Sequence, residues 1–331
     1  MSMDPDLFKK WHAEGLITDN ALHKVQTVEN NRLFSLHWEL KTLLYLGIVL
    51  LSGGLGVLVY KNIDSIGHQA VLAFIALVCA GCYFYCFRSK NPWSPGKVQP
   101  PNPFFDYVLL LGCLAMITFV GYLQFQYSLF GKGYGLVTFI PMVILFASAY
   151  YFDHLGILSL AITNLAAWMG ISVTPLTILK ENDFSNEHLI YTGLGLGLVL
   201  VLAGWVTERR KFKEHFSFTY ANFGTHILFI SGLAGLFLAD RLYIGWFLLL
   251  LGMTVYFFRK ARREGSFYFI LIVILYAYIA LSYVVVHILV KMSNFDFGIV
   301  YVLFLYFILS AIGILRLLII LNRKMKTHDS I

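Results

Sequence analysis

The chain has 331 residues, of which 59% are hydrophobic, 17% aromatic and only 13% charged. Soluble domains average about 45–50% apolar and about 25% charged residues, and a soluble protein of this length cannot remove so much apolar surface from water. The composition therefore excludes a soluble enzyme, a secreted disulfide scaffold and a disordered protein. It predicts a polytopic membrane protein.

The first long polar segment, residues 1–41, predicts a small N-terminal cytosolic helical hairpin with a stalk. Pro5 suits the first turn of a helix, Gly15 suits its end, and Thr18 suits the cap of a second helix. No apolar core of a cleavable signal peptide is present there. Two alternatives are open: the hairpin packs on its own bundle, or it docks a protein partner or a second copy. The candidate partner-docking face consists of Leu7, Phe8, Trp11, Leu22 and Val25.

Apolar runs of the length that spans a bilayer as a helix, about 20 residues, follow one another through the rest of the chain. The sequence thus predicts an all-α, polytopic transmembrane helix bundle of about ten spans. The runs are 42–60, 69–87, 104–123, 135–152, 155–175, 189–206, 219–239, 242–258, 267–290 and 298–321.

Lysine and arginine residues alternate in density along the connections. Nineteen lie in segments 1–41, 88–103, 207–218, 259–266 and 322–331, and five lie in the intervening loops. Cytoplasmic loops carry the excess of these residues, so the asymmetry predicts that both termini are cytoplasmic. The net charge of +7 is then an orientation signal and a contact with the inner leaflet, not a nucleic-acid footprint.

Five parts are expected along the chain. These are the hairpin and stalk (1–41), a two-span unit (42–87), a cytosolic connector (88–103), an eight-span bundle (104–321) and a basic cytosolic tail (322–331). The connector contains five of the eight prolines, which favour a stiff, extended chain.

Cys79, Cys82, Cys86 and Cys113 all lie inside apolar runs. The first three share one stripe of a helix, and a pair spaced as Cys79 and Cys82 can bind metal. No histidine or acidic residue flanks that pair, so packing is the favoured interpretation.

Two stretches carry a family resemblance. The string from Leu7 to Thr18, LFKKWHAEGLIT, is followed by the glycine-rich LYLGIVLLSGGLG of 44–56 and by YKNID of 60–64. The stretch AYYFDHLGILSLA of 149–161, with Asn164, Trp168 and Gly170 after it, continues the pattern. Over residues 5–175 the chain resembles the domain of unknown function 2157 family of bacterial membrane proteins. The resemblance implies a bacterial inner-membrane location and supplies no activity.

Polar residues inside predicted spans are the natural candidates for function. The candidate intramembrane polar lining consists of Asn164, Asn222, His226, Tyr276, Tyr283 and His287. From helical rise, three of them fall about 10–14 Å from the cytoplasmic edge and could meet at one level: Asn164, His226 and Tyr276. His287 would lie near the outer mouth. The alternative is that these groups only make hydrogen bonds between helices, each contributing about 0.6 kcal/mol.

Acidic residues are scarce in the predicted spans. Asp106 and Asp153 fall at inner edges, where water is expected to reach them, and no carboxylate lies in mid-span. This argues against a carrier coupled to protons or sodium through a carboxylate. No zinc, nucleophile or phosphate-loop motif occurs, so no catalytic residue, cofactor or metal ligand is assigned.

Small residues predict close packing of some helices. Gly193 and Gly197 form a small-xxx-small pair, which lets two helices approach closely. Ten spans would also divide into two halves of opposite orientation, which is a common transporter plan. LYLG at 44–47 and IYTG at 190–193 are a weak echo between the halves.

Together these features predict a transporter-like or lipid-handling membrane protein for an uncharged or amphipathic molecule, with the lipid bilayer as its main partner. The alternative is a structural or sensory protein that recruits a partner through the N-terminal hairpin. The sequence does not determine the oligomeric state.

Overall fold

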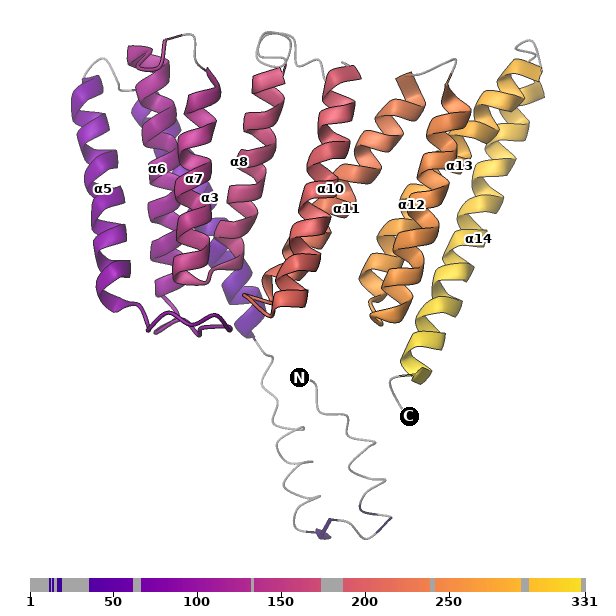
Figure 1. The fold of residues 1–331 in the computed structure, drawn as a ribbon, viewed down its shortest axis with the longest axis horizontal. Coiled ribbons are helices and arrows are strands. Elements are labelled where there is room, and N and C mark those ends of the chain that lie inside the picture. The colour runs from indigo at the N-terminus through magenta and orange to yellow at the C-terminus, as the bar shows by residue number, and fades with distance from the viewer. Residues whose placement is uncertain are drawn as a thin grey trace. The chain divides into compact units, whose positions relative to one another are not determined.

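The computed structural model describes residues 36–61, 67–131, 134–173, 187–238, 242–292 and 298–328, together with His12, Glu14 and 17–19. These residues contain ten α-helices and no strand, one helix for each predicted apolar run (Figure 1), so the all-α polytopic fold is confirmed. The helices are α3 (Leu36–Lys61), α5 (His68–Ser89), α6 (Phe105–Tyr127), α7 (Tyr134–Phe152), α8 (Leu155–Val173), α10 (Glu187–Arg210), α11 (Phe216–Leu238), α12 (Tyr243–Arg263), α13 (Phe267–Met292) and α14 (Gly298–His328).

Eight of these helices are long and apolar enough to cross a membrane, namely α5, α6, α7, α10, α11, α12, α13 and α14. The apolar parts described in α3 and α8 are shorter, Thr42–Leu51 and Leu155–Gly170. Most large apolar side chains of α14 are exposed, as expected for a helix that faces lipid. Pro141 lies inside α7, which neighbouring helices make tolerable in a membrane span.

The chain divides into two compact units, Met1–Val71 and Leu72–Ile331. Within the first unit the structure describes α3 and the beginning of α5, and near the N-terminus His12 Nε2 lies 2.6 Å from Asp19 Oδ1. The predicted docking face of the hairpin lies outside the described residues. The five-part domain division stays a prediction.

Two main apolar cores hold the second unit together. The first joins α5, α6, α7, α8, α10 and α11, around residues such as Leu109, Leu145 and Leu158. The second joins α10, α11, α12 and α13 around Phe229 and Leu250. Since α10 and α11 contribute to both cores, they form the centre of this unit.

The contact between α10 and α11 is built on glycine. A Cβ placed on Gly197 would lie 3.0 Å from the carbonyl oxygen of Gly224, and a Cβ on Gly224 would lie 2.9 Å from that of Gly197. The two backbones therefore touch without an intervening side chain, as the small-residue spacing of α10 predicts.

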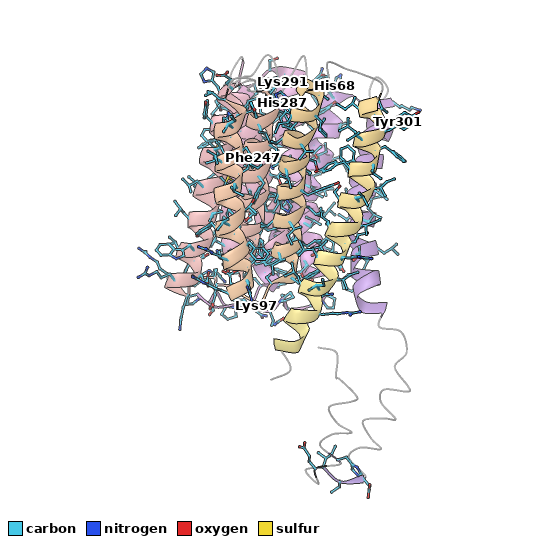
Figure 2. All side chains as sticks on the ribbon, turned by 90° about the vertical axis from the view of Figure 1, so that its right-hand side faces the viewer. His68, Lys97, Phe247, His287, Lys291 and Tyr301 are labelled. Atoms are coloured by element: carbon cyan, nitrogen blue, oxygen red, sulfur yellow. The ribbon has the colours of Figure 1, made fainter. Side chains whose placement is uncertain are left out.

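Neighbouring helices of the second unit run in alternate directions, so its loops gather at two ends (Figure 1). One end holds residues 90–104, 153–154, 211–215 and 264–266, with the basic last turns of α5, α10 and α12. We call it the basic end; Lys97 lies there, while His287 and Lys291 lie at the opposite end (Figure 2).

Candidate functional site

One pair of the predicted polar lining lies within hydrogen-bond distance across two helices. His226 of α11 and Tyr276 of α13 are joined by a 2.7 Å hydrogen bond between Nδ1 and the hydroxyl, with their rings edge to face. Tyr276 also stacks on Phe229, with 5.1 Å between ring centroids. The pair is thus built into the packing of α11 against α13.

The other members of the predicted lining are distributed along the bundle. Asn164 donates to the carbonyl of Leu160 in its own helix, and Asn222 accepts a hydrogen bond from the Tyr268 hydroxyl. The structure therefore shows local partners for both amides. A shared substrate path through these residues stays a prediction.

At the opposite end, His287 lies between two tyrosines. Its ring centroid is 4.9 Å from that of Tyr243 and 5.8 Å from that of Tyr283. The Tyr283 hydroxyl donates to the carbonyl of Phe237 at 3.5 Å, a marginal distance. His287 Nε2 is buried without a hydrogen-bond partner. These three rings form an aromatic cluster at the end of the bundle that lacks the arginine-rich turns.

The basic end contains a buried ionic cluster, which we call the loop joint: Asp153, Lys213 and His215. Lys213 Nζ lies 3.2 Å from Asp153 Oδ2, and His215 Nε2 lies 2.7 Å from Asp153 Oδ1. The side chains of Lys213 and Asp153 are 0% and 1% exposed. The expectation that water reaches Asp153 is wrong, because three loops fold over this carboxylate.

The proline-rich segment supplies the third loop of the joint. Lys213 Nζ donates to the carbonyl of Gly96, the Lys213 backbone N–H donates to that of Pro95, and the Val98 N–H donates to Asp153 Oδ2. The indole of Trp93 donates to the carbonyl of Tyr150. The connector is therefore held at both ends of its central turn by residues of the α7–α8 and α10–α11 turns.

The backbone of the joint takes an unusual form. Asp153 and Lys213 have φ values of 61° and 49°, in the left-handed region that non-glycine residues rarely adopt. Such conformations persist where surrounding contacts fix them. The tight turn before His154 and the basic cluster 209–213 are the only sequence signals for this site, and neither reveals that they meet.

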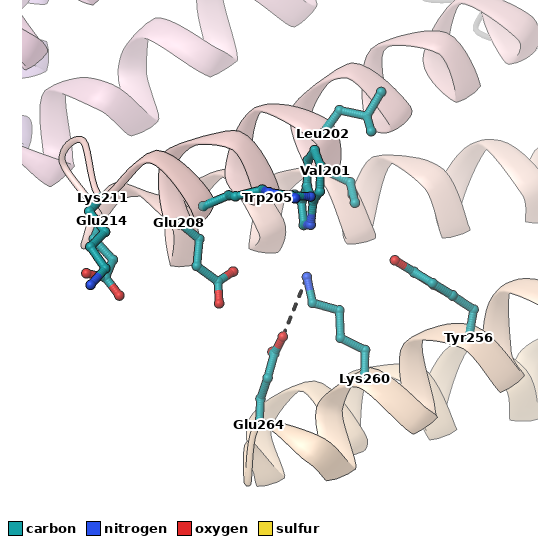
Figure 3. A pocket seen from close by; sticks show the side chains of 10 residues that line it. Val201, Leu202, Trp205, Glu208, Lys211, Glu214, Tyr256, Lys260 and Glu264 are labelled. Atoms are coloured by element: carbon teal, nitrogen blue, oxygen red, sulfur yellow. Dashed lines mark ion pairs between the residues drawn. The ribbon is translucent and has the colours of Figure 1, made fainter.

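A cleft of about 710 Å³ lies between α10 and α12, beside the loop joint. We call it the α10–α12 cleft (Figure 3), and it is lined by Val201, Leu202, Trp205, Glu208, Arg209, Lys211, Glu214, Tyr256, Lys260 and Glu264. Its aliphatic and aromatic residues lie toward the middle of the helices. Its charged residues lie toward the basic end, so the cleft is amphipathic along its length.

Two contacts organise the charged side of the cleft. Lys260 Nζ lies 3.6 Å from Glu264 Oε1, and the Arg209 guanidinium lies 5.0 Å above the ring of Trp205. The α10–α11 turn contributes residues both to the lining of the cleft and to the loop joint. Lys211 and Glu214 of this turn line the cleft, while Lys213 between them is buried against Asp153. Sequence reasoning missed this site because its residues come from two helices and a turn.

The described residues contain no cluster of three or more histidine, cysteine or acidic side chains able to hold a metal ion. Cys86 of α5 and Cys113 of α6 are buried in the first core, and Cys113 Sγ lies 3.3 Å from the Tyr83 hydroxyl. The Tyr83 hydroxyl also lies 3.2 Å from Ser148 Oγ, which links α5, α6 and α7.

Eight of the described helices are long and apolar enough to cross a membrane, which makes this chain a polytopic helical membrane protein. Residues 9–158 match the family model described as "Predicted membrane protein (DUF2157)", which confirms the family resemblance seen in the sequence. No curated protein and no solved structure matches the chain significantly. The family match includes Asp153 but ends before α10, so it carries no information about the α10–α12 cleft.

Proposed function

We propose that this protein is a lipid-handling membrane protein that binds an amphipathic molecule in the α10–α12 cleft. The observation that carries the proposal is the layout of the cleft, whose walls are apolar toward mid-membrane and charged toward the basic end. Its volume of about 710 Å³ falls within the range of ligand pockets, about 300–1,000 Å³.

An amphipathic ligand fits this layout better than a wholly apolar one. An apolar molecule that filled the whole cleft would desolvate charged side chains without pairing them, which is unfavourable. A molecule with a polar headgroup and an apolar chain would place each part against a matching wall. On the side of the cleft toward mid-helix, Leu202, Trp205 and Tyr256 would contact the apolar chain of the ligand.

We further propose that the basic end faces the cytoplasm of a bacterial cell, with the protein in the inner membrane and both termini inside. The arginine and lysine residues in the last turns of α5, α10 and α12 support this orientation, since such residues are enriched in cytoplasmic loops. The cleft would then receive its ligand from the inner leaflet.

Filling the cleft tests the proposal. Leu202→Trp adds a large ring to the wall of the cleft, whereas Leu309→Trp places the same ring at an exposed position of α14, a helix that contributes no residue to the cleft lining. Native mass spectrometry of the purified full-length protein, titrated with phosphatidylethanolamine, measures lipid binding. We expect Leu202→Trp to weaken binding about fivefold or more and Leu309→Trp to leave it unchanged. Equal binding by both variants would overturn the proposal.

A further inference from the structure

The charged residues of the α10–α12 cleft balance one another. Three carboxylates, Glu208, Glu214 and Glu264, share its lining with three cations, Arg209, Lys211 and Lys260. The formal charge of the lining is therefore zero, although the end of the protein on which it lies is strongly basic.

The carboxylates are concentrated in this place. Among the described residues at the basic end of the second unit, the only other acidic side chains are Asp106 and Asp153. Asp153 is buried in the loop joint, where it pairs with Lys213, and Asp106 Oδ1 lies 3.8 Å from His154 Nε2. Among the described residues at this end, the exposed acidic residues are therefore the three glutamates of the cleft.

A second cleft on α12 provides an internal contrast. It has a volume of about 460 Å³ and shares Tyr256, Lys260 and Glu264 with the first. Its remaining charged residues are Arg259 and Arg263, so its lining carries three cations and a single carboxylate. This neighbouring surface suits the anionic headgroups of the inner leaflet, and the α10–α12 cleft differs from it by its added carboxylates.

The charge pattern discriminates between classes of headgroup. An anionic headgroup can pair with the three cations but gives the three glutamates no partner and is repelled by them. A headgroup that carries both a phosphate and an ammonium can pair with the cations and the carboxylates together. The ring of Trp205 already holds a cation, the Arg209 guanidinium, and aromatic faces of this kind also attract an ammonium group.

The charged residues are free to engage such a ligand. The Lys260 and Glu264 side chains are 26% and 41% exposed, so their mutual pairing contributes little and costs little to rearrange. Glu208 and Glu214 are exposed as well, from opposite sides of the α10–α11 turn. In the loop joint, by contrast, Lys213 and Asp153 are buried and paired with each other.

We propose that the α10–α12 cleft selects a phospholipid with a zwitterionic headgroup. The phosphate lies beside Arg209, Lys211 and Lys260, and the ammonium lies beside the glutamates. This inference rests on the proposed function, that the cleft binds an amphipathic molecule, and adds the chemical class of the ligand.

Competition between two phospholipids tests the selection. Equal amounts of phosphatidylethanolamine, which is zwitterionic, and phosphatidylglycerol, which is anionic, are offered to the full-length protein, and the retained lipids are counted by native mass spectrometry. We expect the unmodified protein to retain the zwitterionic lipid about threefold over the anionic one. The double variant Glu208→Gln/Glu264→Gln should shift the preference about threefold or more toward phosphatidylglycerol.

Glu187→Gln is the matched control, because it removes the same kind of charge from an exposed residue at the other end of α10. It should leave the preference unchanged. Leu202→Trp separates the two proposals in the same experiment. If Leu202→Trp reduces lipid binding but the unmodified protein shows no preference, or prefers phosphatidylglycerol, the zwitterionic selection is overturned and the proposed function is kept. If Leu202→Trp does not reduce lipid binding, the retained lipid is annular only, and both proposals are overturned.

Discussion

The loop joint and the α10–α12 cleft contain the same kinds of charged residue in opposite environments, and both take part of them from the α10–α11 turn. In the joint, Lys213 is fully buried and makes an ion pair and two hydrogen bonds to the neighbouring loops. In the cleft, Lys211 and Glu214 are exposed. A charge that is buried and paired is structural because removing its partner is costly, whereas a solvated charge is available to a ligand. Within one short turn, Lys213 is therefore fixed in a structural ion pair, while Lys211 and Glu214 on either side of it stay exposed.

The largest expected effect comes from breaking the joint. Asp153→Asn keeps a side chain that tolerates the left-handed backbone but leaves the buried Lys213 without a counter-charge. We expect the free energy of unfolding to fall by about 3–5 kcal/mol, measured by detergent denaturation followed with circular dichroism.

A compensated variant guards against simple misfolding. Asp153→Asn/Lys213→Met removes both charges, so most of the lost stability should return. A loss below about 1 kcal/mol for Asp153→Asn alone, the size of a surface pair, would show that the joint does not hold the three loops together.

The next largest effect is expected at the close contact between α10 and α11, the two helices that the turn shared by joint and cleft connects. Gly224→Ala would place a Cβ 2.9 Å from the Gly197 carbonyl oxygen and force α10 away from α11. We expect a loss of about 1–3 kcal/mol in the same denaturation measurement. Gly195→Ala is the control, since no atom lies within 4 Å of its added Cβ. If both variants behaved alike, close backbone contact would not be what stabilises the α10–α11 pair.

The smallest effect on stability is expected in the cleft. Glu264→Gln breaks the partly exposed contact with Lys260, and exposed pairs of this spacing contribute about 0.3–0.5 kcal/mol. Thermal unfolding in detergent should therefore change little. A loss as large as that of Asp153→Asn would mean that the cleft charges are structural, and the distinction between the two regions would disappear.

Several properties of this chain could be predicted from its residues alone. The apolar runs predicted ten helices, because each must satisfy its backbone internally in a bilayer. The spacing of Gly193 and Gly197 predicted close packing, which the contact of Gly197 with Gly224 shows. The strings around Leu7–Thr18 and Tyr150–Asn164 predicted the family that residues 9–158 match.

The sites could be predicted only in part. The sequence predicts that His226 and Tyr276 lie at the same depth, and the structure joins them in a hydrogen bond. Asp153 was expected to face water because it follows an apolar run directly, and sequence position does not reveal which loops cover a turn.

By itself, the sequence determined the elements of the protein: composition and periodicity give membrane helices, since a bilayer imposes length and hydrophobicity on each span separately. Only the tertiary structure decided which charged side chains are buried in ion pairs and which stay exposed. Asp153 and Lys213 are 60 residues apart and become a buried pair because two tight turns and a proline-rich loop meet at one end of the bundle. Glu208 and Lys260 become parts of one cleft because α10 and α12 flank the same space. Burial and proximity are properties of packing, and no local pattern encodes them.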